Sequence, residues 1–204
     1  MYCLPDDVRA ELKENGYLTT RAVEFLLNLA TNKAQLRGDA FAFQVGALPV
    51  MKRDLEEFGS DDEFTLLRQC REFFRSKGLH TADDMILPIL EDSHYFVICF
   101  RQEEKGLKVF IYNLLSTHHR KSYWDGIIDI FFRWLPIVFQ FQNLLTACTL
   151  STKVLYVKPP QQMGTVDCGL FTIGFIVHIL VVGLVEEETF TQNNIQGLQK
   201  NYSN

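Results

Sequence analysis

Cys168 stands in the string QQMGTVDCGLF, immediately before a long apolar run. If that run is a helix, its N-terminus carries positive partial charge and unpaired N–H groups, which stabilise the thiolate form of a cysteine. Gly169 follows directly and leaves no side chain in the path of a substrate backbone that approaches the sulfur. The side-chain amide of Gln162, together with the backbone N–H of Cys168, is a suitable donor to a developing oxyanion. This pattern predicts a nucleophilic cysteine.

A nucleophilic cysteine needs a general base, and the base needs a group that orients it. His94 begins the string HYFVICF, and Asn113 ends the string LKVFIYN. In a hairpin the first residue of one strand lies close to the last residue of the other. We therefore predict that His94 is the base and that the amide oxygen of Asn113 holds the imidazole in one tautomer.

The elements that would hold these residues follow from the spacing of the apolar side chains. Up to about residue 80 the chain is charged and has helical spacing, with one helix beginning at Thr19–Thr20 and another opening at Ser60 and closing near Gly78. Beyond it, short runs rich in Ile, Val, Phe and Tyr predict consecutive strands, two of them joined as a hairpin. The strands are expected at 85–90, 95–100, 107–112 and 153–157.

Two apolar segments complete the pattern. Residues 124–146 have helical spacing but are interrupted by Pro136. Residues 168–185 are near the lower length limit for a membrane span, yet they contain His178 and lack flanking basic residues. We expect a buried helix there, preceded by a loop at 161–167. The order of helices, strands, helix, strand, loop and helix predicts an α+β fold with one sheet.

The length of 204 residues fits one sizeable domain or at most two small ones, and we predict a single catalytic domain over residues 1–204. The chain is 47% hydrophobic, enough for a substantial core, and we divide it into a helical N-terminal lobe (about 1–80) and a lobe with the sheet and the nucleophile helix (about 81–204). A net charge of -5 gives no reason to expect nucleic acid or a membrane as partner. The five cysteines are odd in number and widely spaced, which predicts a reduced intracellular chain without a metal site.

Four strings resemble the Ulp/SENP-type cysteine proteases of the adenain-like clan. They are LTTRAVEFLLNL at 18–29, DDMILPILEDSHYFVICF at 83–100, FIYNLL at 110–115 and PPQQMGTVDCGLFT at 159–172. The resemblance implies a papain-like cysteine protease fold that is circularly permuted, in the order His–Asn–Gln–Cys, with a central mixed sheet flanked by helices. It also implies hydrolysis, without a cofactor, after the Gly-Gly terminus of a ubiquitin-like modifier such as SUMO, NEDD8 or ubiquitin. We expect the chain to act as a monomer.

The chain departs from the family pattern at two positions. The family usually has Asp where this chain has Asn113, and an amide orients a histidine without stabilising an imidazolium by charge. The family usually has Trp after the catalytic histidine, where it roofs a tunnel for Gly-Gly; Tyr95 stands there and is the predicted substrate-binding residue, with Gly169. Gln162 is preferred to Gln161 on the family spacing.

Three other functions stay open. A YopJ-like acyltransferase reuses a His/Cys pair, but it needs an acyl-CoA and usually an inositol phosphate, and no basic pocket for the latter is evident. A viral or transposon-type protease would cleave its own polyprotein. A catalytically weak module would bind a ubiquitin-like tail without turning it over, and Asn113 is the feature that keeps this alternative open.

Overall fold

The computed structural model describes residues 5–13, 18–33, 36–57, 72, 79, 82–91, 94–103, 106–112, 121–139, 152–157 and 168–184. A mixed five-stranded sheet with strand order β1-β2-β3-β4-β5 lies at its centre. The strands are β1 (Ala40–Ala42), β2 (Asp84–Glu91), β3 (His94–Glu103), β4 (Gly106–Tyr112) and β5 (Thr152–Val157). β2, β3 and β4 are antiparallel neighbours, whereas β1 and β5 join the two edges in parallel.

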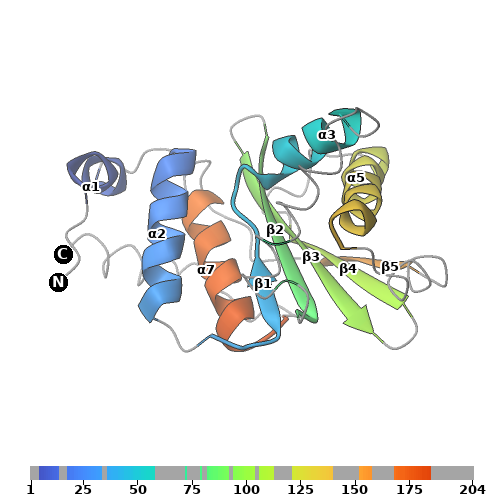
Figure 1. Cartoon of the computed structure of the whole chain (residues 1–204). Coiled ribbons are helices and arrows are strands. Elements are labelled where there is room, and N and C mark those ends of the chain that lie inside the picture. Colours follow the sequence, from blue (N-terminus) through green and yellow to red (C-terminus); the bar gives the residue numbers. More distant parts are fainter. Residues whose placement is uncertain are drawn as a thin grey trace.

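Helices cover both faces of this sheet (Figure 1). Their bounds are α1 (Asp6–Lys13), α2 (Thr20–Lys33), α3 (Ala47–Glu57), α5 (Lys121–Phe139) and α7 (Cys168–Val181). α2 and α7 lie side by side on one face, and α3 and α5 pack together on the other. The arrangement is an α+β fold with a mixed sheet flanked by helices, as predicted. No helix in these described ranges is long and apolar enough to cross a membrane.

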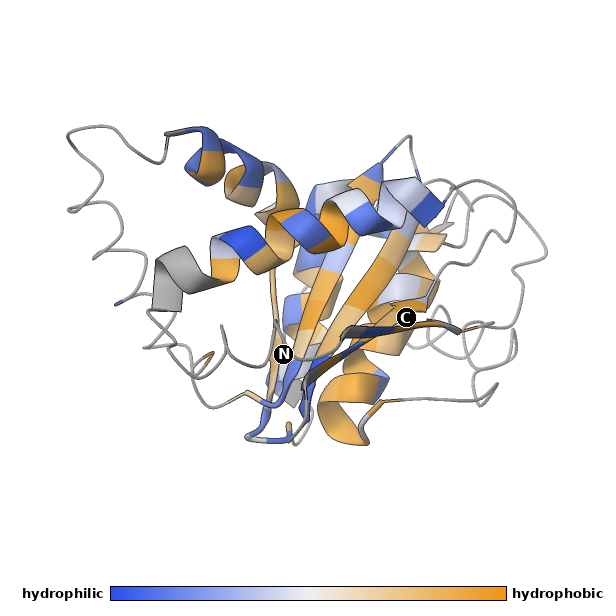
Figure 2. Ribbon diagram, turned by 90° about the vertical axis from the view of Figure 1, so that its right-hand side faces the viewer, coloured by the Kyte–Doolittle hydropathy of each residue, from blue (hydrophilic) through white to orange (hydrophobic). Residues whose placement is uncertain are grey.

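Alternation along β3 divides the core into two clusters. Tyr95, Val97 and Cys99 point toward α2 and α7, where they join one set of buried side chains. Phe96, Ile98 and Phe100 point the other way and pack with α3 and α5. Successive side chains of a strand face opposite sides of its sheet, so a central strand covered on both faces is apolar throughout. Figure 2 shows these hydrophobic strands between helices that also carry hydrophilic residues.

The sequence predicts most of these elements within a few residues. The predicted cap of α2 is confirmed, because the Thr19 hydroxyl accepts a hydrogen bond from the Ala22 N–H at 3.3 Å. The predicted interruption of the helix at Pro136 is wrong, since α5 continues through this residue to Phe139. Burial of its apolar face, with Trp124, Phe131 and others, outweighs the loss of one helical hydrogen bond. β1 was not predicted, and the helix expected between 60 and 78 lies outside the described residues.

An ion-pair network fixes the C-terminal end of α7 to the sheet. The carboxylate of Asp84 is fully buried and accepts hydrogen bonds from Arg101 Nε at 2.7 Å, Arg101 Nη2 at 2.8 Å and Arg37 Nη1 at 3.0 Å. The Arg37 backbone N–H donates to the Leu180 carbonyl at 2.8 Å. Three segments distant in sequence therefore meet at the last turn of α7, and they set the position of this helix on the sheet.

Candidate active site

α7 begins at the predicted nucleophile. Cys168 is its first residue and is 1% exposed, and the buried residues that follow it make the helix apolar on nearly every side. Such a helix is stable only inside a protein, where its surroundings also fix its direction. The N–H groups of its first turn have no partner within the helix, so its positive end lies at the thiol. This placement confirms Cys168 as the start of the apolar helix and suits a reactive cysteine.

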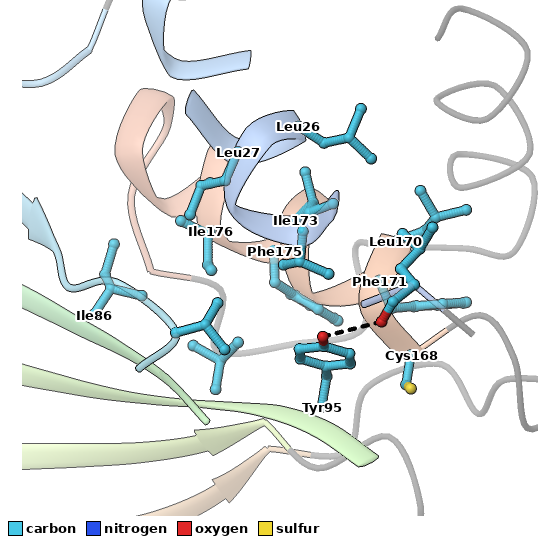
Figure 3. Close-up of a cluster of buried hydrophobic side chains, with 14 of the residues drawn as sticks. Leu26, Leu27, Ile86, Tyr95, Cys168, Leu170, Phe171, Ile173, Phe175 and Ile176 are labelled. Carbon is cyan, nitrogen blue, oxygen red and sulfur yellow. Dashed lines mark hydrogen bonds between the residues drawn. The ribbon is translucent and has the colours of Figure 1, made fainter. Parts of the chain in front are cut away.

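Tyr95 lies beside Cys168 at the start of α7 (Figure 3). Its side chain is 2% exposed, and its hydroxyl donates a hydrogen bond to the Leu18 carbonyl at 3.0 Å. Burial raises the pKa of Tyr95 to about 12, and the negative charge of a thiolate at Cys168 acts in the same direction. The ring is thus part of the core between β3, α2 and α7. Its role as a roof over substrate stays a prediction.

Gly169 packs against α2. A Cβ atom built on this glycine would lie 3.1 Å from Leu18 Cβ and 3.2 Å from Val23 Cγ2. Both distances are shorter than ordinary van der Waals contacts, so a glycine lets the start of α7 approach the start of α2 closely. The structure gives a packing reason for this glycine, and the substrate-binding role predicted for it stays untested.

His94 is the first residue of β3, directly before Tyr95. Its side chain is 8% exposed, and its ring centroid lies 6.2 Å from that of Phe96. Alternation places His94 on the α3–α5 side of the strand, whereas Tyr95 points toward α7. Because Tyr95 lies beside Cys168, His94 and Cys168 share one end of the sheet.

The other two predicted catalytic residues, Asn113 and Gln162, lie outside the described residues. β4 is described to Tyr112, whose partner in β3 is Val97. The structure thus brings together Tyr95, Cys168 and Gly169 and holds His94 at the same strand end. Along the chain, the strand that begins at His94 precedes the helix that begins at Cys168, as predicted. The positions of the Asn113 and Gln162 side chains stay predictions.

The remaining cysteine and histidine side chains of the described core have environments unlike that of Cys168. Cys99 is buried within β3, and this burial raises the pKa of its thiol well above the usual value, which suppresses thiolate formation. His178 is partly buried near the end of α7, and burial lowers its pKa. Across the described ranges no group of three His, Cys, Asp or Glu side chains is arranged to hold a metal ion.

Glu91, which the sequence pattern did not single out, lies opposite His94 in the β2–β3 pair. One of its carboxylate oxygens, Oε2, is buried and has no hydrogen-bond partner among the described residues. The sequence does contain a signal for this pairing. Asp92–Ser93 are two polar residues between two apolar runs, a pattern typical of a two-residue hairpin loop, and such a loop pairs the residues on either side of it, Glu91 and His94.

Comparisons with known proteins agree with this fold. Residues 17–204 match the Ulp1 protease family, C-terminal catalytic domain. A search of curated proteins finds no match. Among solved structures, the chain is similar to the yeast C-terminal Ulp1 protease domain in complex with Smt3, the yeast ortholog of SUMO. That likeness has 14% identity and a TM-score of 0.64, and covers 95% of this chain and 78% of the other.

Two further structures resemble the chain. The SUMO protease Ulp1 with its catalytic cysteine oxidised to a sulfenic acid has 13% identity and a TM-score of 0.67, with 98% and 81% of the two chains covered. The Ulp1-like SUMO protease catalytic domain of Chaetomium thermophilum has 16% identity and a TM-score of 0.52, with 97% and 69% covered. At these identities the structural likeness shows the fold.

Proposed function

Because this chain belongs to the Ulp1 protease family and is a cysteine-type peptidase, we propose that it cleaves the bond after the Gly-Gly terminus of a ubiquitin-like modifier, with SUMO the first candidate. The observation that carries this proposal is the position of Cys168 at the positive end of a buried helix, beside the first residues of β3. SUMO is preferred to NEDD8 and ubiquitin because two of the similar structures are named as SUMO proteases and the third contains Smt3, the yeast ortholog of SUMO.

In the proposed reaction His94 takes the proton of Cys168, and the thiolate attacks the carbonyl carbon of the terminal glycine. The backbone N–H of Cys168 and the amide of Gln162 donate to the oxyanion. The imidazolium of His94 then gives its proton to the departing amine as the C–N bond breaks, which leaves a thioester. Water attacks that thioester, His94 takes a proton from the water, and the thiol and the modifier carboxylate are released. Asn113 orients the imidazole throughout.

Capture by modifier probes tests the proposal. SUMO, NEDD8 and ubiquitin, each with a thiol-reactive C-terminus, would be mixed with the wild type, Cys168→Ala and His94→Ala and followed by intact mass. We expect an adduct with SUMO in the wild type, no adduct in Cys168→Ala, and capture slowed by at least about 100-fold in His94→Ala. An adduct that persists in Cys168→Ala would assign the nucleophile elsewhere.

The probe panel also separates the alternatives. Capture of NEDD8 or ubiquitin in place of SUMO would correct the modifier and keep the mechanism. If no modifier is captured while Cys168 still reacts rapidly with iodoacetamide, the Gly-Gly substrate class is wrong and a polyprotein substrate or acyl transfer takes its place. If Cys168 is also unreactive, the domain binds without catalysis. Wild type, Cys168→Ala and His94→Ala must melt at similar temperatures for these comparisons to hold.

A further inference from the structure

The active-site end of the sheet contains a carboxylate on the same face as His94. Glu91 ends β2 and His94 begins β3, and the two are paired residues of the antiparallel ladder. Paired residues project to the same face, with Cβ atoms about 4.5–5.5 Å apart. The preceding residues of β2 on this face, Leu87 and Ile89, belong to the α3–α5 cluster, as does Phe96 after His94. Glu91 and His94 therefore extend one continuous face of the sheet.

On this face Glu91 Oε2 is buried and has no hydrogen-bond partner among the described residues. The Tyr123 ring lies 6.2 Å from that of Phe96, which in turn lies 6.2 Å from the imidazole of His94. Buried polar atoms almost always have partners, so an unsatisfied one indicates a catalytic group, stored strain or an ordered water. The catalytic reading fits here, because a carboxylate oxygen beside a histidine attracts the protonated imidazole.

The chemistry of this chain creates a need for such a charge. A thiolate–imidazolium pair requires stabilisation of the positive imidazolium, and Asn113 is a neutral amide. An opposite charge within about 4–6 Å favours the charged form of an ionisable group, and exclusion of water strengthens that effect. We propose that Glu91 is a positioning residue that supplies the negative charge for the imidazolium of His94, an inference that rests on the proposed function of His94 as the base.

The charged and titratable neighbours of this strand end are few in the described structure. α5 contributes Lys121 and Asp125, both exposed, and Tyr123, while Asp54 of α3 accepts a hydrogen bond from Trp134 Nε1 at 2.9 Å, further along α5. On the opposite face of β3 are Tyr95 and Cys168, with Glu11 and Glu24 near the Tyr95 hydroxyl. Of these groups, Glu91 is the one that the ladder pairs directly with His94.

Replacement of Glu91 tests the proposal through pH dependence. Glu91→Gln removes the charge and keeps the shape, and Glu91→Asp keeps the charge on a shorter side chain. The rate of SUMO-probe capture and the rate of iodoacetamide reaction at Cys168, located by peptide mass mapping, would be measured from pH 5 to 10. Loss of the charge destabilises the imidazolium. In Glu91→Gln we therefore expect the alkaline limb of the capture profile to move down by about one pH unit, and the rise of the iodoacetamide rate that accompanies thiolate formation to move to higher pH.

Well above the imidazolium pKa of both proteins, this shift corresponds to a loss of about tenfold in the maximal capture rate, with an unchanged half-saturating probe concentration because Glu91 is not placed against substrate. Glu91→Asp, which keeps the charge, should retain most of the wild-type capture rate. The matched control is Glu103→Gln at the opposite end of β3, where the carboxylate pairs with Lys108 Nζ at 2.5 Å. This control should leave both profiles unchanged.

The outcomes separate this inference from the proposed function. If the wild type captures no modifier, the iodoacetamide profile of Cys168 still reports on Glu91. Identical profiles for Glu91→Gln and Glu103→Gln would overturn the positioning role, and so would a His94→Ala profile identical to the wild type, because His94 would then not act on the thiol. A lower melting temperature in Glu91→Gln with unshifted capture and iodoacetamide profiles would mean that Glu91 is structural only.

Discussion

The two ends of α7 are held in different ways. At the C-terminal end, the carbonyls of Ile179 and Leu180 accept hydrogen bonds from Arg37, which also pairs with the buried carboxylate of Asp84. At the N-terminal end, Cys168 and Gly169 lie among apolar side chains of α2 and β3. The negative end of the helix is thus matched by a fixed cation, while its positive end lies at the Cys168 thiol among apolar side chains, where it favours a thiolate. The comparison indicates that charged contacts fix the helix at the end away from the predicted nucleophile.

The largest expected effect comes from breaking the charged end. Arg101→Met removes two hydrogen bonds to Asp84 and leaves a buried carboxylate with Arg37 alone. Loss of one partner of a buried ion pair costs about 3–5 kcal/mol, and the remaining arginine reduces this, so we expect the free energy of unfolding in urea to fall by about 3 kcal/mol. The iodoacetamide reactivity of Cys168 should be unchanged in the molecules that stay folded.

The matched control for that prediction is Arg133→Met on α5. Arg133 forms an exposed pair with Asp129 at 3.7 Å, four residues earlier on the same helix. Exposed pairs of this kind contribute about 0.5 kcal/mol or less. Equal losses of stability in the two variants would show that the buried network is no more important than a surface pair.

A smaller effect is expected at the glycine that follows α7. Gly183 has a φ of 119°, and an added Cβ would lie 3.1 Å from Arg37 Nη1. Gly183→Ala combines an unfavourable backbone conformation with displacement of a guanidinium that holds the helix end, so we expect a loss of about 2 kcal/mol in the free energy of unfolding. Gly46→Ala, with open space around the glycine, should change it by less than about 0.5 kcal/mol. An unchanged free energy of unfolding in Gly183→Ala would mean that the ion-pair network does not depend on this turn.

At the N-terminal end of α7, a glycine-to-alanine substitution should lower the free energy of unfolding by a smaller amount. Gly169→Ala places a Cβ 3.1 Å from Leu18 Cβ, close to a rigid backbone, so α2 and α7 must separate slightly. We expect a loss of about 1 kcal/mol, offset in part by the higher helix propensity of alanine. Gly126→Ala within α5 meets nothing within 4 Å and should raise the free energy of unfolding by up to about 1 kcal/mol. Chemical denaturation should therefore show a lower free energy of unfolding for Gly169→Ala and a higher one for Gly126→Ala. A higher value for both variants would refute close packing at Gly169.

The smallest effect is a pH dependence at Tyr95. Its pKa is raised to about 12 by burial, whereas an unfolded tyrosine titrates near pH 10. Between these values the native state keeps a proton that the unfolded chain loses, so the free energy of unfolding falls as pH rises. Tyr95→Phe lacks this group and also the hydrogen bond to Leu18, worth about 1 kcal/mol. The difference in free energy of unfolding between Tyr95→Phe and the wild type should therefore shrink by about 1 kcal/mol between pH 8 and pH 11, as measured by chemical denaturation. A difference that is the same at both pH values would contradict the raised pKa of Tyr95.

The sequence predicts the centre of the fold better than its edges. β2, β3 and β4 are recognisable because each is a long apolar run between turn residues, and Cys168 because an apolar helix follows it directly. β1 escapes prediction because a strand from Ala40 to Ala42 is too short for alternation to show and depends on pairing with β2. Local rules also failed at Pro136, where packing outweighs propensity.

The candidate site divides in a similar way. Cys168 and His94 follow from their positions at the starts of a helix and a strand. The close approach of Gly169 to α2 and the buried oxygen of Glu91 depend on contacts between segments distant in sequence or across a turn, which residue spacing does not reveal. Asn113, Gln162 and the division into two lobes stay predictions.

The strand order also has a consequence for how the chain folds. β2, β3 and β4 form a continuous meander with short connections, whereas β1 and β5 reach the edges through much longer stretches of chain. Short loops close at a lower entropic cost, so we expect the meander to form early and the parallel edges with α7 to dock later, a sequence of events that pulsed hydrogen exchange would detect. During synthesis α7 leaves the ribosome after the whole sheet, and the thiol end is completed only when this last described helix docks. If Cys168 is the nucleophile, the topology of the chain keeps a newly made molecule inactive until most of it has folded.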